Sequence, residues 1–256
     1  MPKSNSILLF FEEVGDISLF AWRFLKVSFK RPFEFKELLR QCYLIGNQSL
    51  PLVAITGFIM GVVFTLQTRP TLIEFGAESW MPSMVGVAIV REIGPVITAI
   101  ICAGRVGSGI GAELGSMKVT EQIDAMEVSG TNPFKFLIVT RVLAATLMLP
   151  FLVMMADLIS LMGSFLVENI KGDVSLQLYF RQVFAYLHFS DFIPSIIKSF
   201  FFGFVIGIVG CYKGYHSEKG TEGVGKAANT SVVLASMLIF VVDFLAVLVT
   251  DIFYEL

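Results

Sequence analysis

The sequence predicts an all-α integral membrane protein with N-terminal interfacial helices, five transmembrane helices and a short cytoplasmic helix between the second and third spans. Of the 256 residues, 55% are hydrophobic and only 16% are charged, whereas a soluble domain carries about 25% charged residues. The mean hydropathy is +0.77. Five apolar stretches approach the roughly 20 residues that cross a bilayer. Together these observations exclude a soluble globular domain.

The first 48 residues differ from the rest of the chain and are expected to form an interfacial amphipathic segment. Between residues 7 and 40, Phe, Val and Ile residues and Trp22 are mixed with six Lys and Arg residues. Such a mixture is typical of helices that lie in the membrane interface, where aromatic residues are enriched. A soluble N-terminal arm is the alternative. We expect no cleavable signal peptide, because the apolar run at residues 7–11 is too short and is followed by two Glu residues.

Residues 49–256 are expected to form one membrane domain. Its spans are predicted at about residues 50–68, 84–103, 136–167, 193–211 and 232–250. The third span is long and contains Arg141, Pro150 and Asp157. Two half-spans meeting at Pro150 are an alternative, but no polar loop separates the halves. We therefore predict one long, tilted or kinked helix.

The distribution of Lys and Arg residues predicts the orientation in the membrane. Fourteen of the nineteen lie in the N-terminal segment, in the loop between spans two and three with the start of span three, or in the loop between spans four and five. These regions share one side, and basic residues are enriched in cytoplasmic loops. We therefore expect a cytoplasmic N-terminus and a C-terminus on the opposite side.

Two adjacent charges, Arg91 and Glu92, lie inside the second apolar stretch and precede Gly94-Pro95. A charged side chain near the bilayer centre costs about 3 kcal/mol on insertion scales, so such residues mark functional sites by default. Lys198 and Asp243 lie in the fourth and fifth stretches. The pair predicts a protein that handles a polar group inside the membrane. A structural ion-pair network that holds helices together is the alternative.

The loop after the second span contains Gly107, Gly111 and Gly115 at intervals of four residues. In a helix these residues form a smooth stripe that another helix can approach closely. A phosphate-binding loop is disfavoured, because the chain contains no G-x-x-x-x-G-K-[ST] sequence. The chain is therefore not expected to hydrolyse ATP or to act as an enzyme. The cysteine and histidine spacings predict no metal site.

Residues 119–130 predict a short amphipathic helix on the cytoplasmic side. Val119, Ile123 and Met126 share one face. Thr120 is expected to cap the start of this helix and Gly130 to follow its end. Periodicity alone leaves two possibilities open, a solvated connector and a docking element for a soluble partner.

Several runs in the chain resemble the MlaE/YrbE permeases, the membrane subunits of ABC transporters that work with MCE proteins in lipid transport. The similarity covers roughly residues 40–256. The runs are REIGPVITA at 91–99, AGRVGS at 103–108, AELGSMKVTEQIDAMEV at 112–128, CYKG at 211–214 and EGVG at 222–225.

The resemblance implies a homodimeric permease with a lipid cavity at the dimer interface. It implies that polar and apolar residues near the lipid are Arg91, Glu92, Gln67 and Lys198, with Phe64 and Phe75 as weaker candidates. It also implies that the amphipathic segment is a coupling helix that docks on an ATPase, with the contributing residues Glu113, Thr120, Glu121, Ile123, Asp124, Met126 and Glu127.

The partners implied by the resemblance are a cytoplasmic ABC ATPase of the MlaF type, which would bind ATP and Mg²⁺, a periplasmic MCE protein of the MlaD type, and a STAS-domain protein of the MlaB type. The expected location is the bacterial inner membrane. The expected function is the movement of phospholipids between that membrane and the MCE protein, which maintains outer-membrane lipid asymmetry. No nucleic-acid partner and no cofactor in this chain are expected. An ion- or proton-coupled secondary transporter and a non-transporting membrane scaffold are the alternatives.

Overall fold

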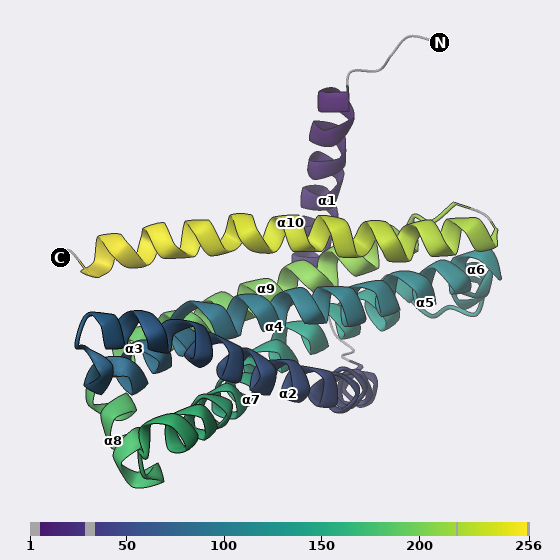
Figure 1. Ribbon diagram of the computed structural model, residues 1–256. Helices are drawn as coiled ribbons and strands as arrows, with labels where there is room; N and C mark the ends of the chain where they lie inside the picture. The colour runs from purple at the N-terminus through teal and green to yellow at the C-terminus, as the bar shows by residue number, and fades with distance from the viewer. Residues whose placement is uncertain (1–5, 29–33, 219, 255–256) are drawn as a thin grey trace. The chain divides into compact units, whose positions relative to one another are not determined.

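A computed structural model describes residues 6–28, 34–218 and 220–254, and no β-strand occurs among them (Figure 1). The basic residues Lys3, Lys30, Arg31 and Lys219 lie outside the described residues. The helical elements are α1 (Ser6–Ser28), α2 (Phe35–Glu74), η1 (Glu78–Trp80), α3 (Met81–Ala88), η2 (Ile89–Ile93), α4 (Gly94–Cys102), η3 (Ala103–Gly107), α5 (Ser108–Val119), α6 (Gln122–Val128), η4 (Phe134–Val139), α7 (Thr140–Gly172), α8 (Leu176–Tyr186), α9 (Phe189–Tyr215) and α10 (Thr221–Tyr254). The segments η2, η3 and η4 are π-helical.

Five helical stretches are long and apolar enough to cross a membrane, which confirms the predicted all-α membrane fold. They are Phe35–Glu74, Glu78–Val119, Phe134–Gly172, Phe189–Tyr215 and Thr221–Ile252. Each stretch is longer than the predicted span it contains. The third passes through Pro150 without a break, so one long helix is present rather than two half-spans. The expected domain boundary after residue 48 lies inside α2, which begins at Phe35.

The chain forms two compact units, and each is built from three separate pieces of sequence. The first unit comprises Met1–Leu44, Ala103–Ala145 and Phe204–Ala235, and the second comprises Ile45–Cys102, Thr146–Gly203 and Ser236–Leu256. Among the described residues, the first unit contains ten of the fifteen Lys and Arg residues.

Glycine residues allow three helices to approach one another closely in the first unit, as the predicted stripe requires. A Cβ atom added to Gly210 of α9 would lie 3.0 Å from the carbonyl oxygen of Gly107. At Gly214 the corresponding distance to the oxygen of Gly111 is 2.9 Å. A Cβ atom on Gly111 would lie 2.7 Å from Oγ of Ser231 in α10. The four-residue glycine spacing therefore forms a packing surface, as predicted.

Helix α1 packs on the other two pieces of the first unit through aromatic side chains. The ring of Phe20 lies 5.2 Å from that of Phe134 and 5.6 Å from that of Tyr212, both in edge-on geometry. The guanidinium carbon of Arg23 lies 4.3 Å from the centre of the Phe134 ring, within cation–π range. Lys213 of α9 pairs with Glu13 of α1. Apolar, aromatic and ionic contacts therefore hold α1 against this unit.

The second unit has a core in which α3 packs against α8. Its buried residues are Leu72, Met81, Val85, Ile89, Val90, Leu161, Tyr179 and Val183. Tyr179 is fully buried, and this burial raises the pKa of its phenol to about 12. The core fixes α3 and, directly after it, the π-helical segment that carries Arg91 and Glu92.

Helices α2 and α7 approach each other closely within the second unit. A Cβ atom on Gly57 would lie 3.1 Å from the carbonyl oxygen of Ala156. The carbonyl of Gly57 also accepts a hydrogen bond of 2.8 Å from Oγ of Ser160. A Cβ atom on Gly61 would overlap the backbone of Ser160. Only glycine fits at position 61 without separating the two helices.

Replacing Gly61 with alanine is expected to lower the thermal stability of the detergent-solubilised protein. The added methyl group must push α7 away, and overpacking of this kind typically costs about 1–3 kcal/mol. Fluorescence-detected gel filtration after heating measures the effect. Gly109→Ala is the matched control, because a Cβ atom at Gly109 would meet no atom within 4 Å. Equal stability of the two variants would contradict the proposed close contact.

Candidate ligand-binding site

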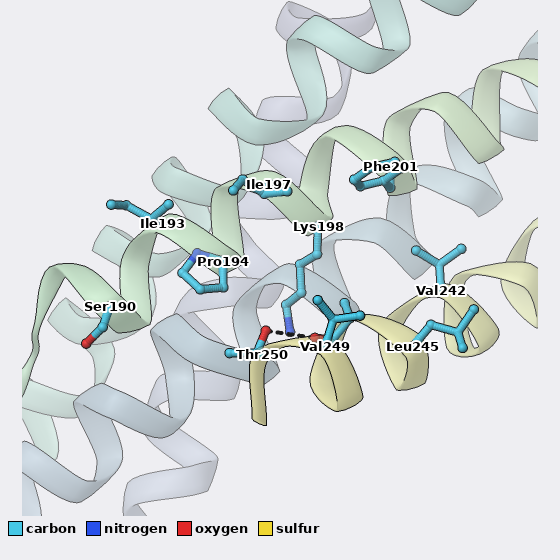
Figure 2. A pocket seen from close by; sticks show the side chains of 11 residues that line it. Ser190, Ile193, Pro194, Ile197, Lys198, Phe201, Val242, Leu245, Val249 and Thr250 are labelled. Carbon is cyan, nitrogen blue, oxygen red and sulfur yellow. Dashed lines mark hydrogen bonds between the residues drawn. The ribbon is translucent and has the colours of Figure 1, made fainter. Parts of the chain in front are cut away.

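The second unit contains a pocket of about 750 Å³ between α9 and α10 (Figure 2). Most of the side chains that line it are apolar. The lining residues are Ser190, Ile193, Pro194, Ile197, Lys198, Phe201, Val242, Leu245, Ala246, Val249 and Thr250. The spacing of three and four residues along both helices places these side chains on facing stripes. A pocket of this size and polarity suits a ligand with a large apolar part.

Lys198 is the ionisable side chain among these lining residues. Figure 2 shows it extending from α9 toward α10. Its Nζ donates a hydrogen bond of 2.6 Å to Oε2 of Glu92 and one of 3.0 Å to Oδ1 of Asp243. The side chain of Lys198 is only 4% exposed. The pairing of Lys198 with two carboxylates compensates for the removal of its charge from water.

Arg91 and Glu92 lie in the π-helical segment η2. Such single wide turns often occur at functional sites. The two side chains pair with different partners, as expected for neighbouring residues that point about 100° apart. Glu92 contacts Lys198, and the guanidinium of Arg91 lies 4.0 Å from Oδ1 of Asp191. Both residues line a smaller pocket that also includes Lys198 and Ser195.

Two acidic members of this cluster, Asp191 and Asp243, were not identified as site residues from the sequence. Asp243 was visible as a charge within the fifth span, but its partner was not. Asp191 precedes the predicted fourth span by two residues. It lies seven residues before Lys198 on α9, and this spacing places both on one face of the helix. A search for charges in helical register with Lys198 would therefore have found it.

The structure brings together three of the six predicted lipid-contacting residues, namely Arg91, Glu92 and Lys198. The other three lie elsewhere in the second unit and do not line the described pocket. Phe64 packs against the buried core, Gln67 is exposed, and the side chain of Phe75 is 80% exposed. Contact between these three residues and a lipid stays a prediction.

Arg69 forms a second buried ion network that the sequence analysis did not predict. The predicted first span ended at about residue 68, but α2 continues through Arg69 and Pro70 to Glu74. Nη1 of Arg69 donates a hydrogen bond of 2.9 Å to Oε1 of the buried Glu168, and its Nη2 donates one of 2.9 Å to the carbonyl oxygen of Lys171. Arg69 also pairs with Glu78. This network ties α2 and η1 to the end of α7.

Replacing Arg69 with methionine is expected to destabilise the protein by about 3–5 kcal/mol, because it leaves the buried carboxylate of Glu168 without its partner. A large drop in the denaturation temperature, measured in detergent, is the expected result. The double variant Arg69→Met with Glu168→Leu removes both charges and should recover much of the loss. No recovery would show that the pair is not the cause.

Within the predicted segment 119–130, helix α6 of the first unit covers only Gln122–Val128, and Val119 is instead the last residue of α5. Ile123 is buried, whereas Glu121, Asp124 and Glu127 are exposed and Met126 is half-buried. The predicted capping role of Thr120 was wrong, because Thr120 ends α5 and its hydroxyl donates to the carbonyl oxygen of Ser116 at 2.8 Å. Glu121 occupies the N-cap position of α6 with a φ of 57°, in the left-handed region.

The remaining candidate for coupling, Glu113, belongs to α5 in the first unit and pairs with Arg141. It accepts hydrogen bonds of 2.8 and 3.3 Å from Nη2 and Nε of Arg141, which is almost fully buried. This two-pronged contact satisfies a buried guanidinium. It explains why an arginine is tolerated near the start of α7. Among the described residues, no group of three or more His, Cys, Asp or Glu side chains is placed to hold a metal ion.

Five helices that can span a membrane, together with an apolar pocket beside an ion cluster, define a multi-pass membrane protein with a candidate ligand site. Comparison with known proteins identifies the family. The chain belongs to the permease MlaE family, whose pattern it matches over residues 38–249. It is therefore an ABC transporter permease, and membership of this class implies a partner ATPase.

Relatives from three kinds of organism are similar over most of this chain. A probable ABC transporter permease protein of Rickettsia prowazekii is 40% identical over 96% of this chain and 94% of its own length. A probable ABC transporter permease protein of Synechocystis is 34% identical over 82% of this chain and 80% of its own length. The chloroplastic protein trigalactosyldiacylglycerol 1 of Arabidopsis thaliana is 32% identical over 89% of this chain and 68% of its own length.

Proposed function

We propose that this permease moves phospholipids between the inner membrane and a periplasmic MCE protein, and that this movement maintains the lipid asymmetry of the outer membrane. The pocket of the second unit carries the proposal. Its lining is mostly apolar and suits acyl chains, and the charged side chain in that lining, Lys198, forms a polar cluster with Glu92 and Asp243 that suits a headgroup. Phospholipids combine these two properties.

The name of one relative supports lipid as the substrate class. The Arabidopsis relative is named after a galactolipid. Membership of an ABC permease family also favours nucleotide-driven transport over an ion-coupled secondary transporter. A lipid that enters the pocket of the second unit could place its acyl chains along the stripes of α9 and α10 and its headgroup near the ion cluster.

The proposed orientation places the first unit on the cytoplasmic side. This unit holds ten of the fifteen described Lys and Arg residues, and basic residues are enriched in cytoplasmic loops. Helix α6 belongs to this unit and would contact the ATPase there. The proposed assembly is a homodimer of the permease with ABC ATPases, a periplasmic MCE protein and a STAS-domain protein.

Purification of the permease together with its genomic neighbours tests this proposal. We expect an ATPase and an MCE protein to copurify, bound phospholipid to be detected by mass spectrometry, and reconstituted complex to move fluorescent phospholipid only with ATP. A monomer that conducts ions without nucleotide, or a complex that contains no phospholipid and moves none, would refute the proposal.

A further inference from the structure

We propose that the pocket of the second unit selects zwitterionic aminophospholipids, such as phosphatidylethanolamine, over anionic phospholipids, such as phosphatidylglycerol. This inference rests on the proposed function, because it specifies the headgroup of the lipid that is moved. It follows from the charge, the exposure and the hydrogen bonding of the side chains at the polar end of the pocket.

The ionisable side chains of the cluster carry an excess of one negative charge when all are ionised. Two are cations, Arg91 and Lys198, and three are carboxylates, Glu92, Asp191 and Asp243. A headgroup that carries a net negative charge is repelled by such a cluster, whereas a headgroup with an ammonium group is attracted.

The buried carboxyl group of Asp157 in α7 does not reverse this sign. It lies near enough to Lys198 to interact electrostatically, and its two oxygens have no hydrogen-bond partner within the described part of the chain. If Asp157 is ionised, the negative excess grows. If it is protonated, the excess from the other five groups is unchanged.

The two carboxylates are more accessible than the ammonium group, although of these three groups only Lys198 and Glu92 line the smaller pocket and Asp243 contacts the cluster through Lys198. The side chain of Lys198 is 4% exposed, whereas those of Asp243 and Glu92 are 19% and 40% exposed. The Lys198 ammonium group is also engaged by both carboxylates. Lys198 therefore acts as a positioning residue that holds the two carboxylates, and their accessible oxygens can accept hydrogen bonds from a ligand ammonium group.

Arg91 supplies the complementary group for the lipid phosphate. Its side chain is 40% exposed, and its guanidinium lies 4.0 Å from Oδ1 of Asp191. A guanidinium can bind a phosphate through two parallel hydrogen bonds. Arg91 and Glu92 both line the smaller pocket, so one headgroup can place its phosphate on the guanidinium and its ammonium group on the carboxylate.

Ser195 provides an independent indication of a polar ligand. Ser195 is 1% exposed and lines the smaller pocket with Arg91 and Glu92. Its hydroxyl has no hydrogen-bond partner among the described residues. A buried hydroxyl without a partner is unfavourable. A headgroup at this position would provide the missing hydrogen bond.

Site-specific photocrosslinking tests the selectivity inside the pocket. The photoreactive residue p-benzoylphenylalanine replaces Ile197, which lines the pocket, and the purified complex is reconstituted in equimolar phosphatidylethanolamine and phosphatidylglycerol. The same residue in place of Leu158, an exposed position of α7 outside the described pockets, reports the composition of the surrounding lipid. Mass spectrometry identifies the crosslinked lipids. We expect the phosphatidylethanolamine ratio at Ile197 to exceed that at Leu158 about threefold, the size expected for partly exposed ion pairs.

Charge variants test the cause of the selectivity. Glu92→Gln and Asp243→Asn, made separately, each remove the net negative charge of the cluster. Each should lower the ratio of crosslinked phosphatidylethanolamine to phosphatidylglycerol at Ile197 to the value at Leu158. Glu74→Gln removes an exposed carboxylate of the same unit outside the pocket and should leave the enrichment unchanged.

The outcomes separate this inference from the proposed function. Equal ratios at the two positions, or enrichment of phosphatidylglycerol at Ile197, would overturn the headgroup selectivity while phospholipid transport stands. Enrichment that persists in both charge variants would also overturn it. Absence of any phospholipid crosslink at Ile197 would count against the inference and the proposed function together.

Discussion

Replacing Lys198 with methionine is expected to reduce phospholipid transport at least tenfold and to destabilise the second unit. The substitution leaves Glu92 and Asp243 facing each other without the ammonium group that binds both. Loss of one partner from a buried ion pair typically costs about 3–5 kcal/mol. ATP-driven movement of fluorescent phospholipid in proteoliposomes measures the first effect, and the denaturation temperature in detergent measures the second.

Two further variants separate a role in lipid binding from a purely structural role. Lys171→Met changes an exposed lysine of the same unit and should alter neither quantity. The triple variant Lys198→Met, Glu92→Gln, Asp243→Asn removes every charge of this network and should restore stability. Transport that stays low in the stable triple variant supports contact with lipid. Full recovery of transport would show that the network only holds the helices together.

Reversing two charges on α6, in the variant Glu121→Lys with Asp124→Lys, is expected to weaken association with the ATPase about tenfold or more. Both side chains are exposed, so the variant should still fold and insert. Like charges that meet across an interface cost several kcal/mol. Copurification of the ATPase with the tagged permease, followed by titration of the purified subunits, measures the loss.

The control for this variant carries the same change in net charge at other exposed positions. Glu12→Lys with Glu222→Lys alters α1 and the start of α10 within the first unit and should retain normal association. Normal association in the α6 variant would show that α6 does not contact the ATPase. Equal losses in both variants would indicate a general electrostatic effect rather than a specific contact.

The sequence predicted the spans because each contains a long apolar run, and apolar length is a local property. It predicted the glycine stripe at residues 107, 111 and 115 for the same reason, since a four-residue period is visible within one segment. The lengths of the helices were underestimated. Charged and polar residues such as Arg69 continue α2 beyond its apolar centre, because a partner on another helix compensates for their burial.

The site was only partly predictable, because its contacts join residues that are distant in the sequence. The sequence indicated Arg91, Glu92 and Lys198 as costly intramembrane charges. It did not show that Asp243, 45 residues beyond Lys198, binds the same ammonium group. The capping error at Thr120 has a local cause, since its hydroxyl binds the preceding turn instead of the following helix. Threonine can form either contact, and only the backbone path decides between them.

The wide turn at Ile89–Ile93 has a consequence for how this family can vary. An α-helix rotates by about 100° per residue, so one additional residue in a turn changes the direction of every side chain that follows. Within the second unit, α3 keeps its packed face against α8, and α4 begins in a different rotational phase. Deleting one residue from this turn would therefore rotate all the side chains of α4 about the helix axis without altering the sequence of α4. The number of residues in this wide turn therefore sets the directions of the Arg91 and Glu92 side chains. A relative without the extra residue would need different side chains to form the same site.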